Sequence, residues 1–138
     1  MHNPKNFINS YHFKFFLFFT SDNNITGKAG ILYFSKAYAE YFQNYPQITT
    51  PMFSFDMFRY DKDLQQKMQQ IIDARIEILF AFVVKGVELG EFPDTVDVQA
   101  LTDSLFGVIW STTFIWQMGG CTFDLKDRIM KAVTGILD

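Results

Sequence analysis

The sequence predicts an all-α fold, and the spacing of its apolar residues is the main reason. Apolar residues recur at intervals of three and four along most of the chain, which is the period of one face of a helix. The alternation of apolar and polar residues that is typical of half-buried strands is nearly absent. The chain has 138 residues, of which 49% are hydrophobic, so it suits one domain with a substantial core. We therefore expect a single all-α domain over residues 1–138, a bundle of about five to six helices.

The first expected helix, from Asn3 to Thr20, is apolar on almost all sides. Seven of the nine residues from Tyr11 to Phe19 are aromatic or leucine. This run is shorter than the roughly 18 to 20 apolar residues of a membrane span. A signal peptide, with Lys5 as its positive region, is the alternative, but no small-x-small cleavage site follows the run. A helix that is apolar all round is covered on more than one side, so we expect two neighbours for this one.

A second helix is expected from about Thr26 to Asn44, with apolar residues on one face at spacings of three and four. Pro46 ends it, because proline lacks the amide that a helix interior requires. Around Pro46 and Pro51 we expect a short element, which contains the apolar residues Met52, Phe53 and Phe55.

The third helix is long and has the clearest pattern in the chain. Asp61 can cap its start, and Gly90 stands where a left-handed residue commonly ends a helix. A linker over residues 91–95 follows. One apolar face persists along the helix, formed by Leu64, Met68, Ile71, Ile72, Leu79, Phe82, Val83 and Val87.

Two helices are expected at the C-terminal end, over residues 97–138. Asp97 can cap the first of them, Gly119 and Gly120 end it, and Asp124 begins the second. The first helix has small residues at spacings of three and four, which let another helix come close: Ser104, Gly107 and Ser111. The second has an apolar stripe that includes Ile129, Val133 and Ile136.

These two helices allow two arrangements. They can complete a four-helix bundle with the same pair from a second chain, in an interface with two-fold symmetry. They can instead pack entirely within one chain. We favour the first arrangement and expect a dimer interface formed by Ser104, Gly107, Ser111, Ile129, Val133 and Ile136.

Charge and motif content argue against several function classes. The formal net charge is −3, and no run of Lys and Arg is present to neutralise nucleic-acid phosphates. No motif for a phosphate-binding loop, a dinucleotide fold or a catalytic nucleophile is present, so we expect no enzyme activity and no cofactor. His2 and His12 are not spaced as metal ligands on a helix, so we expect no metal site. Cys121, the single cysteine, excludes an intrachain disulfide and suits the reducing cytoplasm.

Arg75 stands on the apolar face of the third helix, between Ile72 and Leu79, where a buried charge requires a partner. Two explanations are open. Arg75 can pair with an internal acidic residue or reach an edge of the bundle. Alternatively, its guanidinium can hold the acidic head of a small ligand, because it matches a carboxylate and stays charged at physiological pH.

Large aromatic side chains are more numerous than a compact bundle needs. They make up 18% of the chain, and many fall on the apolar faces of the second, third and fourth helices. Aromatic residues line pockets between bundle helices, although most of them pack in the core. We therefore expect a cavity for a small apolar ligand, with the candidate contacts Tyr38, Phe42, Arg75, Phe82, Trp110 and Phe114.

From Ile31 to Leu137, the order of these elements resembles the C-terminal effector-binding and dimerisation domain of TetR-family transcriptional regulators. The resemblance rests on an ordered set of segments. A helix that ends in YAEYFQNYPQ is followed by a short helix and by a long helix that closes in VVKGVELGEFPD, with the form G-x-x-x-G-x-F. The aspartate-led helix DVQALTDSLFGVIW and a last amphipathic helix follow.

The resemblance implies a homodimer whose last two helices form the interface and whose other helices enclose a pocket for a small, often apolar effector. It also implies that residues 1–20 form a connector helix to a DNA-binding head. The chain departs from the family because it contains no recognisable helix-turn-helix head. We therefore expect a cytoplasmic regulatory domain that reaches DNA only through an absent head and does not contact a membrane. A stand-alone helical small-molecule binder without DNA-binding activity is the alternative.

Overall fold

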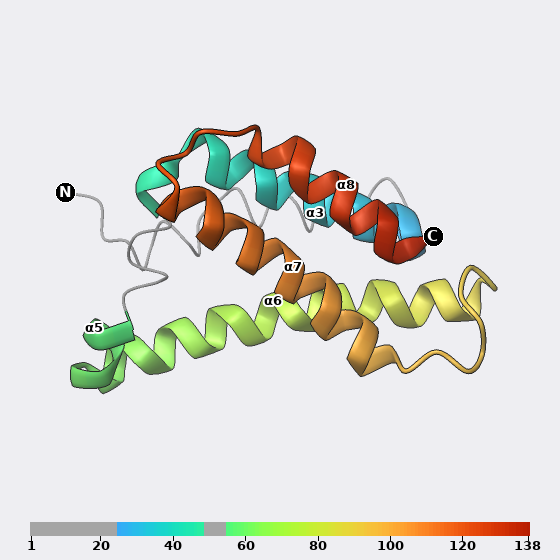
Figure 1. The fold of residues 1–138 in the computed structure, drawn as a ribbon. Coiled ribbons are helices and arrows are strands. Elements are labelled where there is room, and N and C mark those ends of the chain that lie inside the picture. Colours follow the sequence, from blue (N-terminus) through green and yellow to red (C-terminus); the bar gives the residue numbers. More distant parts are fainter. Residues whose placement is uncertain (1–24, 49–54) are drawn as a thin grey trace.

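The computed structural model describes residues 25–48 and 55–138, and every regular element in these ranges is a helix (Figure 1). The all-α prediction is therefore confirmed. The expected helix over residues 3–20, together with Met52 and Phe53, lies outside the described residues. None of the described helices combines the length and the apolarity that crossing a bilayer requires. The elements are α3 (Gly27–Asn44), the 3-10 turn η1 (Pro46–Ile48), α5 (Phe55–Tyr60), α6 (Lys62–Glu88), α7 (Val98–Met118) and α8 (Leu125–Leu137).

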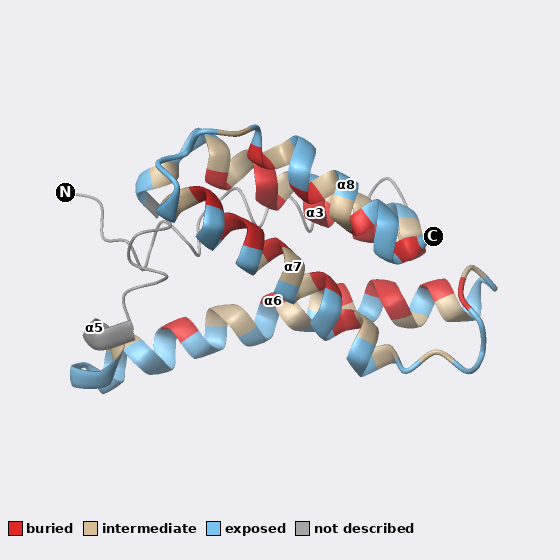
Figure 2. Ribbon diagram, in the orientation of Figure 1, coloured by how far each residue is buried: buried red, intermediate tan, exposed pale blue. Residues whose placement is uncertain are grey.

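Helix α3 is central to the arrangement, because it packs against both α6 and α8. Helices α3 and α8 lie side by side, and α7 contacts α8 and α6 as it crosses between them (Figure 1). The buried positions of α6 concentrate in its second half, whereas its first half, next to α5, is largely exposed (Figure 2). The four long helices share one apolar core, whose fully buried members include Ile31, Phe34, Leu79, Leu105, Ile109 and Leu125.

Three aspartates begin three of the helices, as the sequence predicts. In each case the carboxylate accepts a hydrogen bond from the backbone amide three residues farther on, at 2.9 to 3.0 Å. This amide has no partner within the helix, and the negative charge lies favourably at the helix N-terminus. The confirmed N-caps are Asp61 before α6, Asp97 before α7 and Asp124 before α8.

Glycines end α6 and α7 with the same backbone pattern. After α6, Gly90 has a φ of 75° and its amide donates to the carbonyl of Val87 at 3.0 Å. The amide of Glu91 donates to the carbonyl of Gly86 at 2.8 Å. Gly120, with a φ of 80°, repeats the pattern after α7. Glycine adopts this left-handed conformation at little cost, and the predicted ends of both helices are confirmed.

The end of α6 also docks onto the start of α3. Phe92 is buried, and its ring packs so close to Gly86 that a side chain at that position would collide with it. The backbone amide of Lys28, in the first turn of α3, donates to the Glu91 carboxylate at 3.2 Å. These contacts explain the form G-x-x-x-G-x-F. Its first glycine makes room for the phenylalanine, and its second lets the chain reverse direction.

Two residues predicted to lie in a dimer interface are instead core residues of this chain. Ile129 and Val133 are 0% exposed and belong to the same apolar cluster as Phe34 and Leu105. Their side chains therefore leave no surface for a second chain. The reason is that α8 packs against both α3 and α7, which cover its apolar stripe. Ile136, which is 37% exposed, lies at the edge of that stripe.

The close packing of Gly86 against Phe92 predicts a specific loss of stability. A Cβ atom at position 86 would lie 2.6 Å from the ring, so Gly86→Ala forces the ring or the helix to move. We expect a loss of about 1–3 kcal/mol in the free energy of unfolding, measured by guanidinium denaturation. In a Phe92→Leu background the smaller side chain relieves the collision, so the same substitution should cost less than about 1 kcal/mol. Equal costs in the two backgrounds would contradict this explanation.

Candidate functional site

A groove of about 490 Å³ lies between α5, the exposed first half of α6, and α7. Its lining includes three apolar residues that are buried or half-buried: Met68 and Ile72, one turn apart on α6, and Trp110 on α7. A concave surface that is mainly apolar and carries a few polar groups is typical of a small-molecule site. The remaining lining residues are Phe58 and Arg59 from α5, and Gln65 and Gln69 from α6.

Arg75 lies on the same face of α6, one turn beyond Ile72 and farther into the body of the molecule. It is only 6% exposed, and its guanidinium lies 5.2 Å from the centre of the Tyr38 ring on α3. Contact between a cation and an aromatic face offsets part of the cost of removing the charge from water. Burial lowers the pKa of Arg75 to about 10, so the side chain remains a cation at neutral pH.

Tyr38 belongs to a row of aromatic residues along α3. Its ring centre lies 4.9 Å from that of Phe34 and 5.2 Å from that of Phe42, and all three residues are buried. Residues four apart on a helix share a face, so the three rings form one continuous wall. The guanidinium of Arg75 lies against the middle of this wall.

The structure brings four of the six predicted ligand-binding residues into one region. Trp110 lines the groove itself. Arg75 and Tyr38 are in contact one turn farther in, and Phe42 is the next member of the aromatic row. These residues come from three different helices, so their proximity is a result of the fold and not of sequence spacing.

The other two predicted contacts lie apart from this group. The Phe82 ring packs over Gly30, twelve residues before Phe42 on α3 and roughly 18 Å away along the helix. Gly30 has no side chain, which lets α6 approach α3 closely at this point. Phe114 is 42% exposed on α7. Phe82 is therefore a core residue, and Phe114 is a surface residue outside the groove.

Sequence reasoning missed part of the groove. The apolar spacing of the long helix places Met68 and Ile72 on its core face, and the sequence predicts no role for Phe58. They line a groove instead because the first half of α6 extends past its neighbours (Figure 2). A signal was present in the polar residues Gln65 and Gln69, which lie next to the apolar positions and mark an edge of the core.

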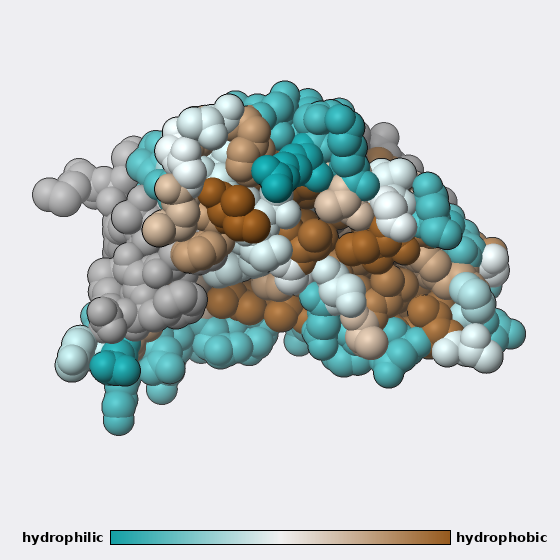
Figure 3. Space-filling model, in the orientation of Figure 1, coloured by the Kyte–Doolittle hydropathy of each residue, from teal (hydrophilic) through white to brown (hydrophobic). Residues whose placement is uncertain are grey.

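An exposed face of α7 is the second notable surface. The small residues Ser104, Gly107 and Ser111 are all exposed on it. Figure 3 shows apolar atoms gathered over this part of the molecule, across α7 and its border with α8. Toward the end of the helix the apolar surface continues with Phe114, Ile115 and Met118.

The helical glycines differ in what surrounds them. At Gly30 and Gly86, a Cβ atom would collide with an aromatic ring, so each of these glycines serves the packing of this chain. At Gly107 on α7 and Gly135 on α8, no atom lies within 4 Å of the Cβ position. A glycine inside a helix costs about 0.5–1 kcal/mol relative to alanine. Packing within one chain does not require a glycine at position 107 or at position 135.

Metal binding has no candidate site in the described part of the chain, where no group of three His, Cys, Asp or Glu side chains comes together. Cys121 is exposed in the turn after α7.

The groove and the buried Arg75 beside it form the candidate site for a small molecule.

Comparison with known proteins gives one family match and one curated relative at significant similarity. A family model described as "YsiA-like protein, C-terminal region" matches residues 47–137, which include the groove, α7 and α8. The fatty acid metabolism regulator protein of Bacillus subtilis (strain 168) is 30% identical over 63 residues, or 46% of this chain and 32% of that protein. The chain thus aligns with about a third of the length of this relative. No solved structure gives a significant match.

The burial of Arg75 predicts the effect of removing its charge. The lowering of its pKa to about 10 by burial corresponds to a desolvation cost of about 3 kcal/mol at neutral pH. We expect Arg75→Met to raise the free energy of unfolding by about 1–3 kcal/mol in urea denaturation at pH 7. Arg128→Met, at an exposed position where the guanidinium lies 4.4 Å from the centre of the Phe123 ring, should lower it by no more than about 1 kcal/mol. A loss of stability in Arg75→Met would contradict the expectation.

The same pKa sets the pH dependence of this effect. Above about pH 10 the unfolded chain keeps a proton on Arg75 that the folded chain has released, so stability rises with pH. Below about pH 10 both states are protonated and the contribution is constant. The difference in stability between wild type and Arg75→Met should therefore be flat from pH 6 to about 9 and shrink above pH 10.

Proposed function

Since this chain belongs to the family of YsiA-like C-terminal regions of TetR-type transcriptional regulators, we propose that it is the regulatory domain of such a regulator. In this function the groove binds a small, largely apolar effector, and the domain forms a homodimer. DNA binding is the task of a helix-turn-helix head outside this chain. Effector binding changes the population of states that differ in operator affinity. The proposal places the protein in the cytoplasm, with the DNA that it controls.

The observation that carries the proposal is an apolar groove with a buried cation one turn beyond it. Met68, Ile72 and Trp110 offer apolar contact, where each buried CH₂ group contributes about 0.8 kcal/mol. Arg75 attracts an anionic group, because a guanidinium forms paired hydrogen bonds with a carboxylate. An effector with an acyl chain and an acidic group satisfies both features. The relative named as a regulator of fatty acid metabolism supports this chemical class.

The exposed face of α7 supports the homodimer. Its small residues allow a second helix to approach, and Gly107 and Gly135 have open space where the backbone of a partner would lie. Two-fold symmetry would place α7 and α8 of one chain against the same helices of the other. The proposed contact residues are Ser104, Gly107, Ser111 and Ile136.

A stand-alone small-molecule binder without DNA-binding activity is the second candidate, because the groove and the buried Arg75 beyond it would serve that function equally well. The groove fits both functions. The family match favours the regulator over the binder, and it favours either over an enzyme. A helix-turn-helix segment encoded in frame ahead of Met1 would favour the regulator, and a stop codon there would favour the binder.

Decanoate tests the groove, with decanol as its neutral counterpart. We expect decanoate to raise the midpoint of thermal unfolding and to change the emission of Trp110. Trp110→Phe should abolish the emission change, because Trp116 is buried and its indole donates to the carbonyl of Phe123. Arg75→Met should weaken decanoate binding by at least about tenfold, or 1.4 kcal/mol, and leave decanol binding unchanged.

Phe114→Ala is the matched control for this experiment, since Phe114 is exposed outside the groove and its loss should change neither affinity. Equal weakening of both probes by Arg75→Met would show that Arg75 does not recognise the acidic group. Absence of stabilisation by either probe would remove the groove as a site for this class of effector.

The homodimer is tested by a charge placed on the face of α7. Gly107→Arg introduces a long cation where helices are proposed to meet, so we expect the wild type to be a dimer and the variant a monomer. Ala81→Arg, at an exposed position of α6, is the control and should remain dimeric. Sedimentation velocity distinguishes the two states. A monomeric wild type, or a dimeric Gly107→Arg variant, would rule out this interface.

A further inference from the structure

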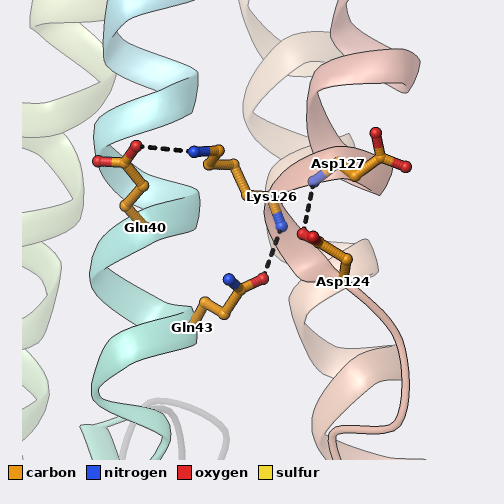
Figure 4. A network of polar contacts seen from close by, with 5 residues as sticks. All are labelled: Glu40, Gln43, Asp124, Lys126 and Asp127. Carbon is orange, nitrogen blue, oxygen red and sulfur yellow. Dashed lines mark hydrogen bonds and ion pairs between the residues drawn. The ribbon is translucent and has the colours of Figure 1, made fainter.

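Helices α3 and α8 are joined by a polar contact at the beginning of α8. The Oε1 atom of Gln43 on α3 accepts a hydrogen bond from the backbone amide of Lys126 at 3.1 Å. The ammonium group of Lys126 lies 3.1 Å from the carboxylate of Glu40, one turn earlier on α3. Figure 4 shows both contacts spanning the two helices. We call this pair of contacts the α3–α8 clamp.

The clamp completes the N-terminal cap of α8. The first amides of a helix have no partner within the helix. Asp124 accepts a hydrogen bond from the amide of Asp127 at 2.9 Å, and the amide of Lys126 donates to Gln43. The first turn of α8 therefore takes one cap from its own sequence and one from α3. Such a bond weakens steeply as the two atoms separate, so α8 keeps the second cap only while α3 stays in place.

The other end of α3 is held in the same way by a different segment. Thr26 occupies the N-cap position of α3, but its side chain makes no capping hydrogen bond. The amide of Lys28 instead donates to Glu91, in the connection between α6 and α7, at 3.2 Å. Helix α3 is thus capped by the segment that follows α6, and it caps α8 in turn. Tyr38 lies between these two capping contacts.

We propose that α3 links the groove to the dimer surface, and that the α3–α8 clamp is the contact through which α3 moves α8. This inference rests on the proposed function. An effector that reaches Arg75 meets the ring of Tyr38, which lies 5.2 Å from the guanidinium. Phe42 follows in the same aromatic row and Gln43 is the next residue, so a displacement of Tyr38 passes along one helix to the clamp.

We expect the α3–α8 clamp to transmit a displacement of α3 to α8 more directly than the apolar packing between the two helices. The apolar contacts between α3 and α8 are non-directional, so they hold the helices together without specifying one donor and one acceptor. The hydrogen bond to Lys126 has a fixed donor and a fixed acceptor, and it sets the register of α8 against α3. The Glu40 and Lys126 side chains are 42% and 41% exposed, so water screens their ion pair and it contributes little alone. Gln43 is therefore the residue whose loss should weaken the transmission of movement from α3 to α8 while the apolar packing between them remains.

The test compares three variants of the full chain. Gln43→Ala removes the acceptor, and Gln43→Glu keeps an acceptor oxygen at the start of α8. Gln70→Ala makes the same truncation at an exposed position of α6 and is the control. NMR measures the exchange rate of the Lys126 amide, and sedimentation measures the dimer dissociation constant with and without decanoate. Trp110 emission reports decanoate binding separately.

In the wild type we expect decanoate to change the dimer dissociation constant by about fivefold or more. Gln43→Ala should speed exchange of the Lys126 amide by about fivefold, as expected for loss of one hydrogen bond. It should also reduce the effect of decanoate on dimerisation to less than about twofold, with decanoate binding unchanged. Gln43→Glu and Gln70→Ala should behave like the wild type.

The inference is overturned if Gln43→Ala keeps the full effect of decanoate on dimerisation, or if Gln70→Ala loses as much of it. Decanoate binding that leaves wild-type dimerisation unchanged also overturns the link, while the groove remains the effector site. A wild type that does not dimerise, or that does not bind decanoate, overturns the link together with the corresponding part of the proposed function.

Discussion

Helix α3 packs against α6 on one side and α8 on the other, and the positions of the remaining helices depend on this packing. Helices α6 and α8 scarcely touch each other directly, so α3 and α7 fix the distance between them. Close approach is possible because Gly30 has no side chain under the ring of Phe82. Burial of Ile31, Phe34 and Phe42 supplies the apolar contact that holds the three helices together.

The limits of the helices were predictable because the signals that set them are local. Asp61, Asp97 and Asp124 each bond to an amide three residues away, so a short window of sequence contains the whole interaction. The ends at Gly90 and Gly120 are equally local, since each depends on one residue in the left-handed conformation.

The assignment of faces was harder, because it depends on how many neighbours each helix has. The apolar stripe of α8 is consistent with either a dimer interface or a core, and only the packing of α3 and α7 shows that Ile129 and Val133 are core residues. The groove presents the same difficulty. Trp110 and Arg75 were predictable as unusual residues, but a groove at Met68 exists only because α6 continues past the helices that cover its second half.

The first half of α6 is less buried than the second. The helix has 27 residues, and most of its buried positions lie from Arg75 onward. Local unfolding costs least where a segment buries least, so amide exchange should slow progressively from Lys62 toward Val83. The groove lies on this less buried half. A molecule bound there would suppress these local openings. The conformational entropy that the helix loses would offset part of the binding free energy.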